Sequence, residues 1–340
     1  MLRMALIEGN NGSSPYRNVE ERIRNGRFTA IAAHNLRTAR DTANLIGAEI
    51  YTDSFHELLT EHGTAFDAVV INSPNRFKNL YCQRSAESGK HILTNAPLAL
   101  SKESALEIIN ACQEAGVSLQ VTQDLRFLPS LQTVKKSLVS GQIGDPGLLR
   151  IHSWKKAIKY DGKKTLESIR KVVKERLLLS GVTREIDVAC WLFNNQPNVI
   201  YAVEGKTVPP ECNGSAYIQL HLGFKGGGMA LIDYSQTLPQ GDDYYSLSMI
   251  GSTGAVYADD HRNMQLLYKG GNPSALKVGE GENYWILQLQ EFINSIEENR
   301  SLLLKESDVL RVIEIAEAVA VSLETGEAVQ MDAETLDEDQ

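Results

Sequence analysis

The sequence predicts an α/β chain that begins with a doubly wound parallel sheet and continues with an α+β region built on a large, mainly antiparallel open sheet. Over residues 1–123, short and uniformly apolar runs alternate with segments of helical periodicity, which is typical of parallel strands covered by helices on both faces. The pattern changes after residue 124, and from 198 to 267 strand-like runs follow one another with short glycine-containing turns between them, which indicates antiparallel pairing. We therefore expect a Rossmann-like domain at 1–123 and an α+β domain at 124–340.

The N-terminal elements follow from the positions of the apolar runs. Strands are predicted at residues 2–7, 28–33, 67–72, 91–94 and 118–122. Helices between them are predicted at residues 18–25, 37–45, 77–88 and 102–114. Because the crossovers between parallel strands are right-handed, these helices are expected on both faces of the sheet.

The C-terminal elements are of two kinds. Helical periodicity predicts helices at residues 129–139, 284–297 and 308–325, and helical structure within 163–193. Strands are predicted at 148–154 and through 198–267, most clearly at 216–224, 229–234 and 245–250. The last residues, 324–340, are acidic and are expected to form a solvated or frayed end.

The bulk composition excludes several classes of protein. The formal charge of −9 argues against nucleic-acid binding, which needs a basic face. No apolar run approaches the roughly 20 residues of a membrane span, so we expect no membrane association. Four cysteines without C-x-x-C spacing and an N-terminus without a signal-peptide pattern favour a cytoplasmic protein with reduced thiols. The seven histidines form no H-x-x-x-H or H-E-x-x-H motif, so no metal site is predicted.

A turn rich in glycine and asparagine follows the first predicted strand. After Glu8 the chain reads Gly9, Asn10, Asn11 and Gly12, and both residue types tolerate positive φ. Such a turn brings backbone amides close to a pyrophosphate at a helix N-terminus. The Glu8 carboxylate would repel those phosphates. The turn is therefore either part of a dinucleotide site or a tight connection without a ligand.

The segment after the second predicted strand carries bases but no acid. It contains His34, Asn35 and Arg37, with Arg40 one turn farther along the predicted helix. NAD sites usually place an acid here for the adenosine ribose, whereas an arginine accommodates the 2′-phosphate of NADP. If a dinucleotide binds, the sequence favours NADP over NAD. The alternative is that these arginines form a solvated helix face.

Several segments resemble one known family. Residues 89–100 read Gly-Lys-His-Ile-Leu-Thr-Asn-Ala-Pro-Leu-Ala-Leu, which is similar to the G-K-H-V-x-x-E-K-P-L-A signature of the glucose–fructose oxidoreductase, inositol dehydrogenase and rhizopine-catabolism (Gfo/Idh/MocA) family. Residues 68–75 resemble its V-x-I-x-T-P-N segment, 126–129 its R-F-x-P, and 186–192 its I-D-x-x-x-W-L. The resemblance implies hydride transfer between a nicotinamide and a hydroxyl-bearing carbon of a sugar or polyol. It places Ser73, Pro74, Asn75 and Asn95 at the cofactor, and it implies a homodimer or homotetramer that pairs through the open sheet.

The residues that assist this chemistry in the family are replaced here. Asn95 and Ala96 stand where the family has the glutamate and lysine of E-K-P, and alanine cannot move a proton. Ser180 and Arg184 stand where the family has an aspartate and a histidine one helical turn apart. Arginine stays protonated near neutral pH, and serine needs an activating base.

Other basic residues are candidates for the missing roles. Lys78 occupies the histidine position of the family's P-N-x-x-H segment. Lys156 belongs to a strongly basic stretch at 155–176, and Arg184 follows that stretch. A basic rim would attract an anionic, sugar-like ligand. The stretch is alternatively a solvated helix that balances acids on a neighbouring subunit.

Two functions follow from these observations. The first is an NAD(P)-dependent oxidoreductase of the Gfo/Idh/MocA type that acts on a sugar or polyol derivative with rearranged or impaired catalysis. The alternative is a non-catalytic relative that binds a nucleotide or an anionic sugar-like ligand as a sensor, scaffold or partner subunit.

Overall fold

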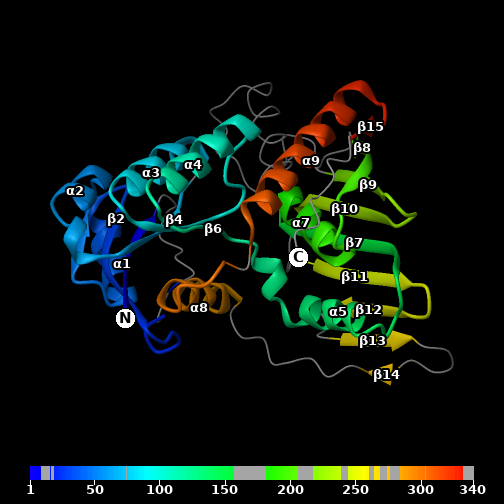
Figure 1. Ribbon diagram of the computed structural model, residues 1–340, viewed down its shortest axis with the longest axis horizontal. Coiled ribbons are helices and arrows are strands. Elements are labelled where there is room, and N and C mark those ends of the chain that lie inside the picture. Colours follow the sequence, from blue (N-terminus) through cyan, green and yellow to red (C-terminus); the bar gives the residue numbers. More distant parts are fainter. Residues whose placement is uncertain are drawn as a thin grey trace. The chain divides into compact units, whose positions relative to one another are not determined.

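A computed structural model of the chain describes residues 1–8, 16, 19–73, 75–156, 181–205, 217–238, 244–259, 264–268, 274–275, 284–302 and 304–331. The chain folds into two compact units, Met1–Phe127 with Gly281–Ile313 and Leu128–Glu280 with Glu314–Gln340 (Figure 1). The units do not follow chain order. Residues 281–313 pack with the first unit, whereas the sequence analysis assigned them to the C-terminal region.

The first unit contains a six-stranded parallel sheet with the order β3-β2-β1-β4-β5-β6. This is the Rossmann order, in which the strand sequence reverses between β1 and β4, and it confirms the predicted fold class. The strands are β1 (Leu2–Glu8), β2 (Gly26–Ala33), β3 (Ile50–Thr52), β4 (Ala68–Asn72), β5 (His91–Thr94) and β6 (Leu119–Val121).

Helices cover both faces of this sheet because its strands bury apolar side chains on both sides. On one face, α1 (Leu36–Ile46) and α8 (Tyr284–Glu297) pack against β1 and β2. On the other face lie α2 (Phe55–Thr60), α3 (Asn75–Glu87), α4 (Lys102–Glu114) and the first part of α9 (Glu306–Thr325), with α3 and α4 side by side (Figure 1). Two short 3-10 turns, η1 (Gly63–Ala65) and η2 (Asp124–Phe127), complete the unit.

The predicted helix at 18–25 is wrong. Residues 20–22 form a turn and residues 24–25 a bend, and Asn25 adopts a left-handed φ of 57°. Val19 and Ile23 are both buried and lie four residues apart, which imitates the spacing of a helix face. The sequence analysis also missed β3 and α2, which are too short to show a clear period.

The second unit contains a nine-stranded, mainly antiparallel sheet, as predicted. Its order is β14-β13-β12-β11-β7-β10-β9-β8-β15, and β7 and β10 are its parallel pair. Its elements are α5 (Pro129–Val139), β7 (Pro146–Lys156), α7 (Thr183–Phe193), β8 (Pro197–Gly205), β9 (Tyr217–Phe224), β10 (Met229–Leu238), β11 (Tyr244–Gly251), β12 (Ala255–Asp259), β13 (Met264–Tyr268), β14 (Ser274–Ala275) and β15 (Val329–Gln330).

Two predictions in the second unit need comment. Helical structure within 163–193 is confirmed by α7, while residues 163–180 lie outside the described residues. The acidic end was expected to be solvated or frayed, but β15 pairs with Val199 and Ile200 of β8, so the prediction is wrong at residues 329–330. Residues 332–340 lie outside the described residues.

The two faces of the large sheet differ in exposure. One face is buried, and on β9 it carries Ile218, Leu220 and Leu222. The opposite face, which we call the open face, carries exposed Tyr217 and His221 on the same strand. The open face thus mixes apolar and polar groups.

Among the helices that the structure describes, none combines the length and apolar character that crossing a lipid bilayer would need.

Candidate functional site

The carboxyl edge of the parallel sheet is the candidate site, because ligands of open α/β sheets bind where the strand order reverses. β1 ends there at Glu8 and β4 at Asn72, and these two residues are register partners. The loops that follow β4 and β5 carry Ser73 and Asn95. Ser73 and Asn95, which are predicted to bind a dinucleotide, therefore follow two adjacent strands of the sheet.

A buried carboxylate lies at the end of β1. Glu8 is buried, and the Asn72 side-chain amide donates to both of its carboxylate oxygens at 3.1 Å. Burial, together with the nearby charges of Glu8 and Asp124, raises the pKa of the Tyr16 hydroxyl far above its ordinary value. A carboxylate at this strand end would repel the pyrophosphate of a dinucleotide that approached it. Gly9, Asn10, Asn11 and Gly12 lie outside the described residues.

The residues after β2 have separate roles in the structure. Asn35 is the N-cap of α1, and its side-chain oxygen accepts a hydrogen bond from the Thr38 amide at 2.8 Å. His34 is exposed, and the exposed Arg37 approaches Asp41 at 3.8 Å. Residues 33–37 offer no carboxylate to a ribose diol.

Hydrogen bonds hold the segment Asn95–Ala96 between the ends of β4 and β6. The Asn95 amide donates to the Ile71 carbonyl at 3.2 Å. With its side-chain amide nitrogen turned toward the main chain, Asn95 also donates to the carbonyls of Ile71 at 3.2 Å and Ser73 at 3.3 Å. The Ala96 amide donates to the Thr122 hydroxyl at 3.2 Å. The backbone that carries Ala96 is thus fixed, although its side chain has no proton to exchange.

The side chain of Lys78 contacts main-chain atoms of this segment and of Pro97. Its side chain is fully buried in the first turn of α3, and Nζ donates to the carbonyls of Asn95, at 2.7 Å, and Pro97. Burial lowers the pKa of Lys78 to about 7, while Cys82 one turn farther along α3 acts in the opposite direction. The hypothesis that Lys78 acts as a catalytic ammonium stays a prediction.

Ser73 is a buried polar group suited to a ligand. Its side chain is fully buried, and its hydroxyl has no hydrogen-bond partner among the described residues. A buried hydroxyl without a partner costs free energy unless a ligand or water satisfies it. Pro74 and the side chain of Asn75 lie outside the described residues. At the carboxyl edge of the parallel sheet, Ser73 and Arg37 are compatible with a nicotinamide dinucleotide, whereas the carboxylate of Glu8 is unfavourable to its phosphates.

The catalytic candidates of the second unit are described only in part. Arg184 lies half-buried in the first turn of α7, between the buried Thr183 and Glu185. Lys156 ends β7, but its side chain lies outside the described residues, as does Ser180 with the rest of 157–180. The basic stretch therefore stays a prediction from sequence.

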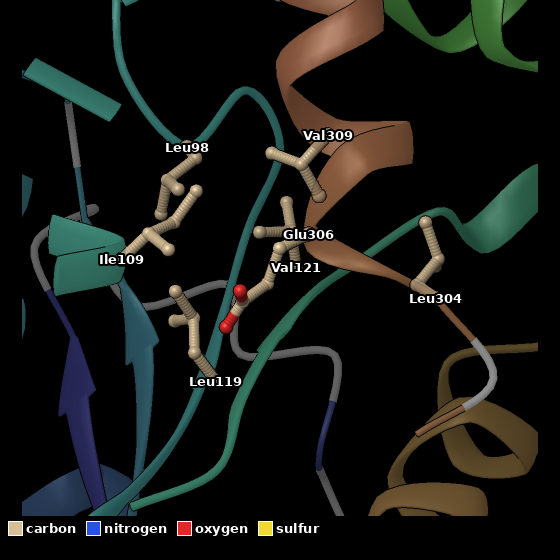
Figure 2. A pocket seen from close by; sticks show the side chains of 7 residues that line it. All are labelled: Leu98, Ile109, Leu119, Val121, Leu304, Glu306 and Val309. Carbon is tan, nitrogen blue, oxygen red and sulfur yellow. The ribbon is translucent and has the colours of Figure 1, made fainter. Parts of the chain in front are cut away.

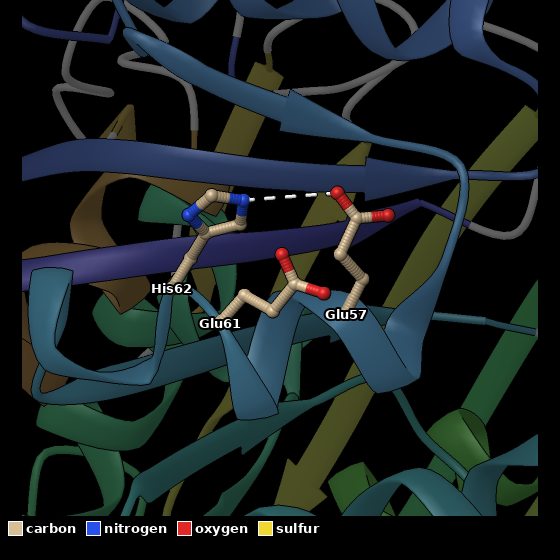
Figure 3. A group of neighbouring side chains, drawn as sticks. All are labelled: Glu57, Glu61 and His62. Atoms are coloured by element: carbon tan, nitrogen blue, oxygen red, sulfur yellow. Dashed lines mark ion pairs between the residues drawn. The ribbon is translucent and has the colours of Figure 1, made fainter.

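Sequence reasoning missed one group of possible metal ligands in the first unit. Ligand atoms of Glu57, Glu61 and His62 all lie within 4.8 Å of one another (Figure 3). His62 Nε2 lies 3.8 Å from a Glu57 oxygen, and the Thr52 hydroxyl donates to the other Glu57 oxygen at 2.8 Å. Ligands of tetrahedral zinc lie about 3.3 Å apart, given bonds of about 2.0–2.1 Å. The group is looser than that and partly exposed, so its geometry is that of a surface ion pair.

Described residues line at least two hollows. The first is a gap of about 10 Å³ in the first unit, no larger than one water molecule, with the Glu306 carboxylate among apolar side chains (Figure 2). The second holds about 200 Å³ on the open face of the second unit. It is lined by His152, Trp154, Tyr244, Ser246, Leu247, Ser248 and Tyr257.

Comparison with known families agrees with this architecture. Residues 4–123 match the family described as "Oxidoreductase family, NAD-binding Rossmann fold", and residues 131–257 match the "GFO/IDH/MocA C-terminal domain". The chain belongs to the Gfo/Idh/MocA oxidoreductase family. Its N-terminal region is accordingly a Rossmann domain of the NAD-binding type.

Individual members of the Gfo/Idh/MocA family are similar over most of the chain. The scyllo-inositol 2-dehydrogenase (NAD(+)) of Bacillus subtilis is 24% identical over 86% of this chain and 85% of its own length. The uncharacterized oxidoreductase YrbE of the same organism is 28% identical, over 63% of this chain and 61% of its own length. Among solved structures, levoglucosan dehydrogenase in complex with NADH and L-sorbose superposes with a TM-score of 0.84 at 17% identity, over 97% of this chain and 99% of that one. At that identity the likeness shows the fold.

Proposed function

We propose that the protein is an NAD(P)-dependent oxidoreductase that acts on a sugar or polyol derivative with a rearranged set of catalytic residues. The observation that carries the proposal is the hydrogen-bonded Asn95–Ala96 segment at the carboxyl edge of a family Rossmann sheet. Its backbone is fixed although the usual lysine is absent. Residues 1–123 would bind the dinucleotide, and 124–340 would bind the substrate and mediate oligomerisation.

The proposed cofactor is NADP in preference to NAD. Arg37 and Arg40 are exposed at the start of α1, where a guanidinium can pair with a 2′-phosphate. Ser73 would donate its unpaired hydroxyl to the nicotinamide half, and Asn95 would hold the adjoining main chain. The turn from Gly9 to Gly12 would receive the pyrophosphate.

A bound nicotinamide would supply hydride transfer, and the chain's residues would have to orient the substrate and move its hydroxyl proton. Ala96 cannot move that proton, and Arg184 can orient an oxygen or an anion but stays protonated. Loss of general acid–base assistance typically costs about 10²–10⁴-fold in rate. We therefore expect slow turnover, or turnover assisted by Lys156.

The proposed substrate is anionic. The support is the basic composition of residues 155–176 in an otherwise acidic chain, which would raise the local concentration of an acidic or phosphorylated sugar.

A non-catalytic relative that binds a nucleotide or anionic sugar-like ligand remains the second candidate function. Ala96, Ser180 and Arg184 favour it, because all three assisting positions of the family have changed together. The protein would then act as a sensor, scaffold or partner subunit.

The proposal includes a cytoplasmic location and a homo-oligomer. Cys82, Cys112 and Cys190 are buried free thiols, which suits a reducing compartment. The open face exposes Tyr217, Met229 and Ile250, and apolar groups on an unpartnered sheet face favour pairing with a second copy.

Calorimetric titration with NADPH and NADH tests the proposal. The protein is titrated as isolated and after unfolding and refolding, because a retained cofactor would mask binding. We expect micromolar affinity, tighter for NADPH, and a preference that shrinks about tenfold when Arg37 and Arg40 are both changed to alanine. Absence of binding up to millimolar concentration would contradict the oxidoreductase and favour the non-catalytic alternative.

A further inference from the structure

Lys78 is a lysine in an unusual environment. Its side chain has no solvent exposure, and it lies in the first turn of α3, where the helix dipole disfavours a positive charge. A buried amine is tolerated when its hydrogens have acceptors. Here Nζ meets the main-chain carbonyls of Asn95 and Pro97. The buried amine therefore has a specific acceptor on each side of Ala96.

This pair of acceptors matches both protonation states of the amine. A neutral amine keeps two N–H groups, which is enough for two carbonyls, and an ammonium has three. The contact therefore does not depend on the charge of Lys78. The main-chain amides of the same segment donate hydrogen bonds to Ile71 of β4 and to Thr122, which follows β6. Lys78 adds hydrogen bonds from α3.

We propose that Lys78 is a positioning residue that fixes the main chain on both sides of Ala96 and thereby shapes the part of the cofactor edge nearest the nicotinamide. The link to the nicotinamide rests on the proposed function, whereas the effect on the main chain does not. Lys78 acts through Asn95 and Pro97, without contact to the reacting atoms.

The chain offers a matched control in Lys90. Its Nζ also donates to two main-chain carbonyls, those of Gly63 at 2.7 Å and Phe66 at 3.0 Å. Lys90 directly precedes β5 and therefore lies at the amino edge of the sheet, opposite the candidate site. Removal of either amine should lower stability, but only loss of Lys78 should loosen the cofactor edge.

The experiment compares Lys78→Met with Lys90→Met. Amide hydrogen exchange is followed at Asn95 and Ala96, and NADPH and NADH affinities are measured by calorimetry. We expect Lys78→Met to speed exchange at these two amides at least tenfold beyond its effect on the amides of β5, and to weaken dinucleotide binding at least tenfold. Lys90→Met should leave the exchange rates of these two amides and the dinucleotide affinity within twofold of the wild-type values.

The outcomes separate this proposal from the proposed function. Unchanged local exchange in Lys78→Met, or an equal change in Lys90→Met, would overturn the positioning role. Absence of dinucleotide binding in the wild type would count against the oxidoreductase alone, because the exchange comparison still decides the role of Lys78. If Lys78→Met does not fold, Lys78→Gln and Lys90→Gln are compared by the same criterion, since the shorter amide keeps a buried donor.

Discussion

At the scale of single residues, the lowered pKa of Lys78 makes stability depend on pH. Below pH 7 its amine is charged in both states, so the folded state bears the full cost of burying the charge. As pH rises from about 7 toward its ordinary pKa of 10.5, the unfolded chain binds more protons than the folded one, and stability must rise.

The expected size is measurable by urea unfolding. Between pH 7 and 8.5 the free energy of unfolding should rise by roughly 1.5 kcal/mol, and this slope should vanish in Lys78→Met. The neighbouring Cys82 and Cys112 thiols have pKa values raised to about 12, so they lower stability only as pH rises above about 9. A flat wild-type profile would show that Lys78 keeps an ordinary pKa.

Residue identities could be read from the sequence, but their partners could not. Asn95 and Ala96 were found because they interrupt a motif. The pairing of Glu8 with Asn72 and the link from Ala96 to Thr122 join strands far apart in the chain. Such contacts depend on which strands are neighbours, and one-dimensional periodicity does not contain that information.

At the scale of elements, variants of Asn35 distinguish its role as the N-cap of α1 from a role in cofactor binding. Its side chain caps α1 at Thr38, so Asn35→Ala should cost about 1 kcal/mol of stability. Asn35→Asp keeps the cap and should cost much less. Denaturant titration of the two variants measures these changes in the free energy of unfolding. If the affinity for the cofactor falls equally in Asn35→Ala and Asn35→Asp, that result supports the predicted contact of Asn35 with the dinucleotide.

Long elements with a clear apolar period were predicted well. The bounds of α4, α5, α8 and β5 agree with the sequence analysis, because each combines a strong pattern with a recognisable start or end. Residues 19–25 show the opposite case, since tertiary burial of Val19 and Ile23 imitates a helix. Short elements such as β3 form through their neighbours rather than through local propensity.

At the scale of the whole molecule, the return of residues 281–313 to the first unit was not predicted. The amphipathic period of α8 shows that one face must be buried, and Ile286, Leu289 and Phe292 are buried against β1 and β2. The period cannot show which sheet buries that face. Local pattern therefore fixes the element, and long-range packing decides the unit to which it belongs.

The open face of the second unit provides the last prediction. Met229 and Ile250 flank Leu148 in one row across β10, β7 and β11, and each is half exposed. If this face pairs with a second copy, a charge in that row would be buried without a partner and would cost several kcal/mol. Ile250→Arg should therefore reduce the mass measured by light scattering to that of a smaller species at micromolar concentration.

Val139→Arg is the control for this experiment. Val139 is more exposed than Ile250, at 76%, and ends α5 rather than lying on the sheet, so an arginine there should leave the mass unchanged. A wild-type protein that is monomeric would contradict the expected oligomer. If instead the wild type is oligomeric and Ile250→Arg stays so, the copies pair through another surface. The hollow beside Trp154 and Tyr244 would then remain open to solvent in the assembly.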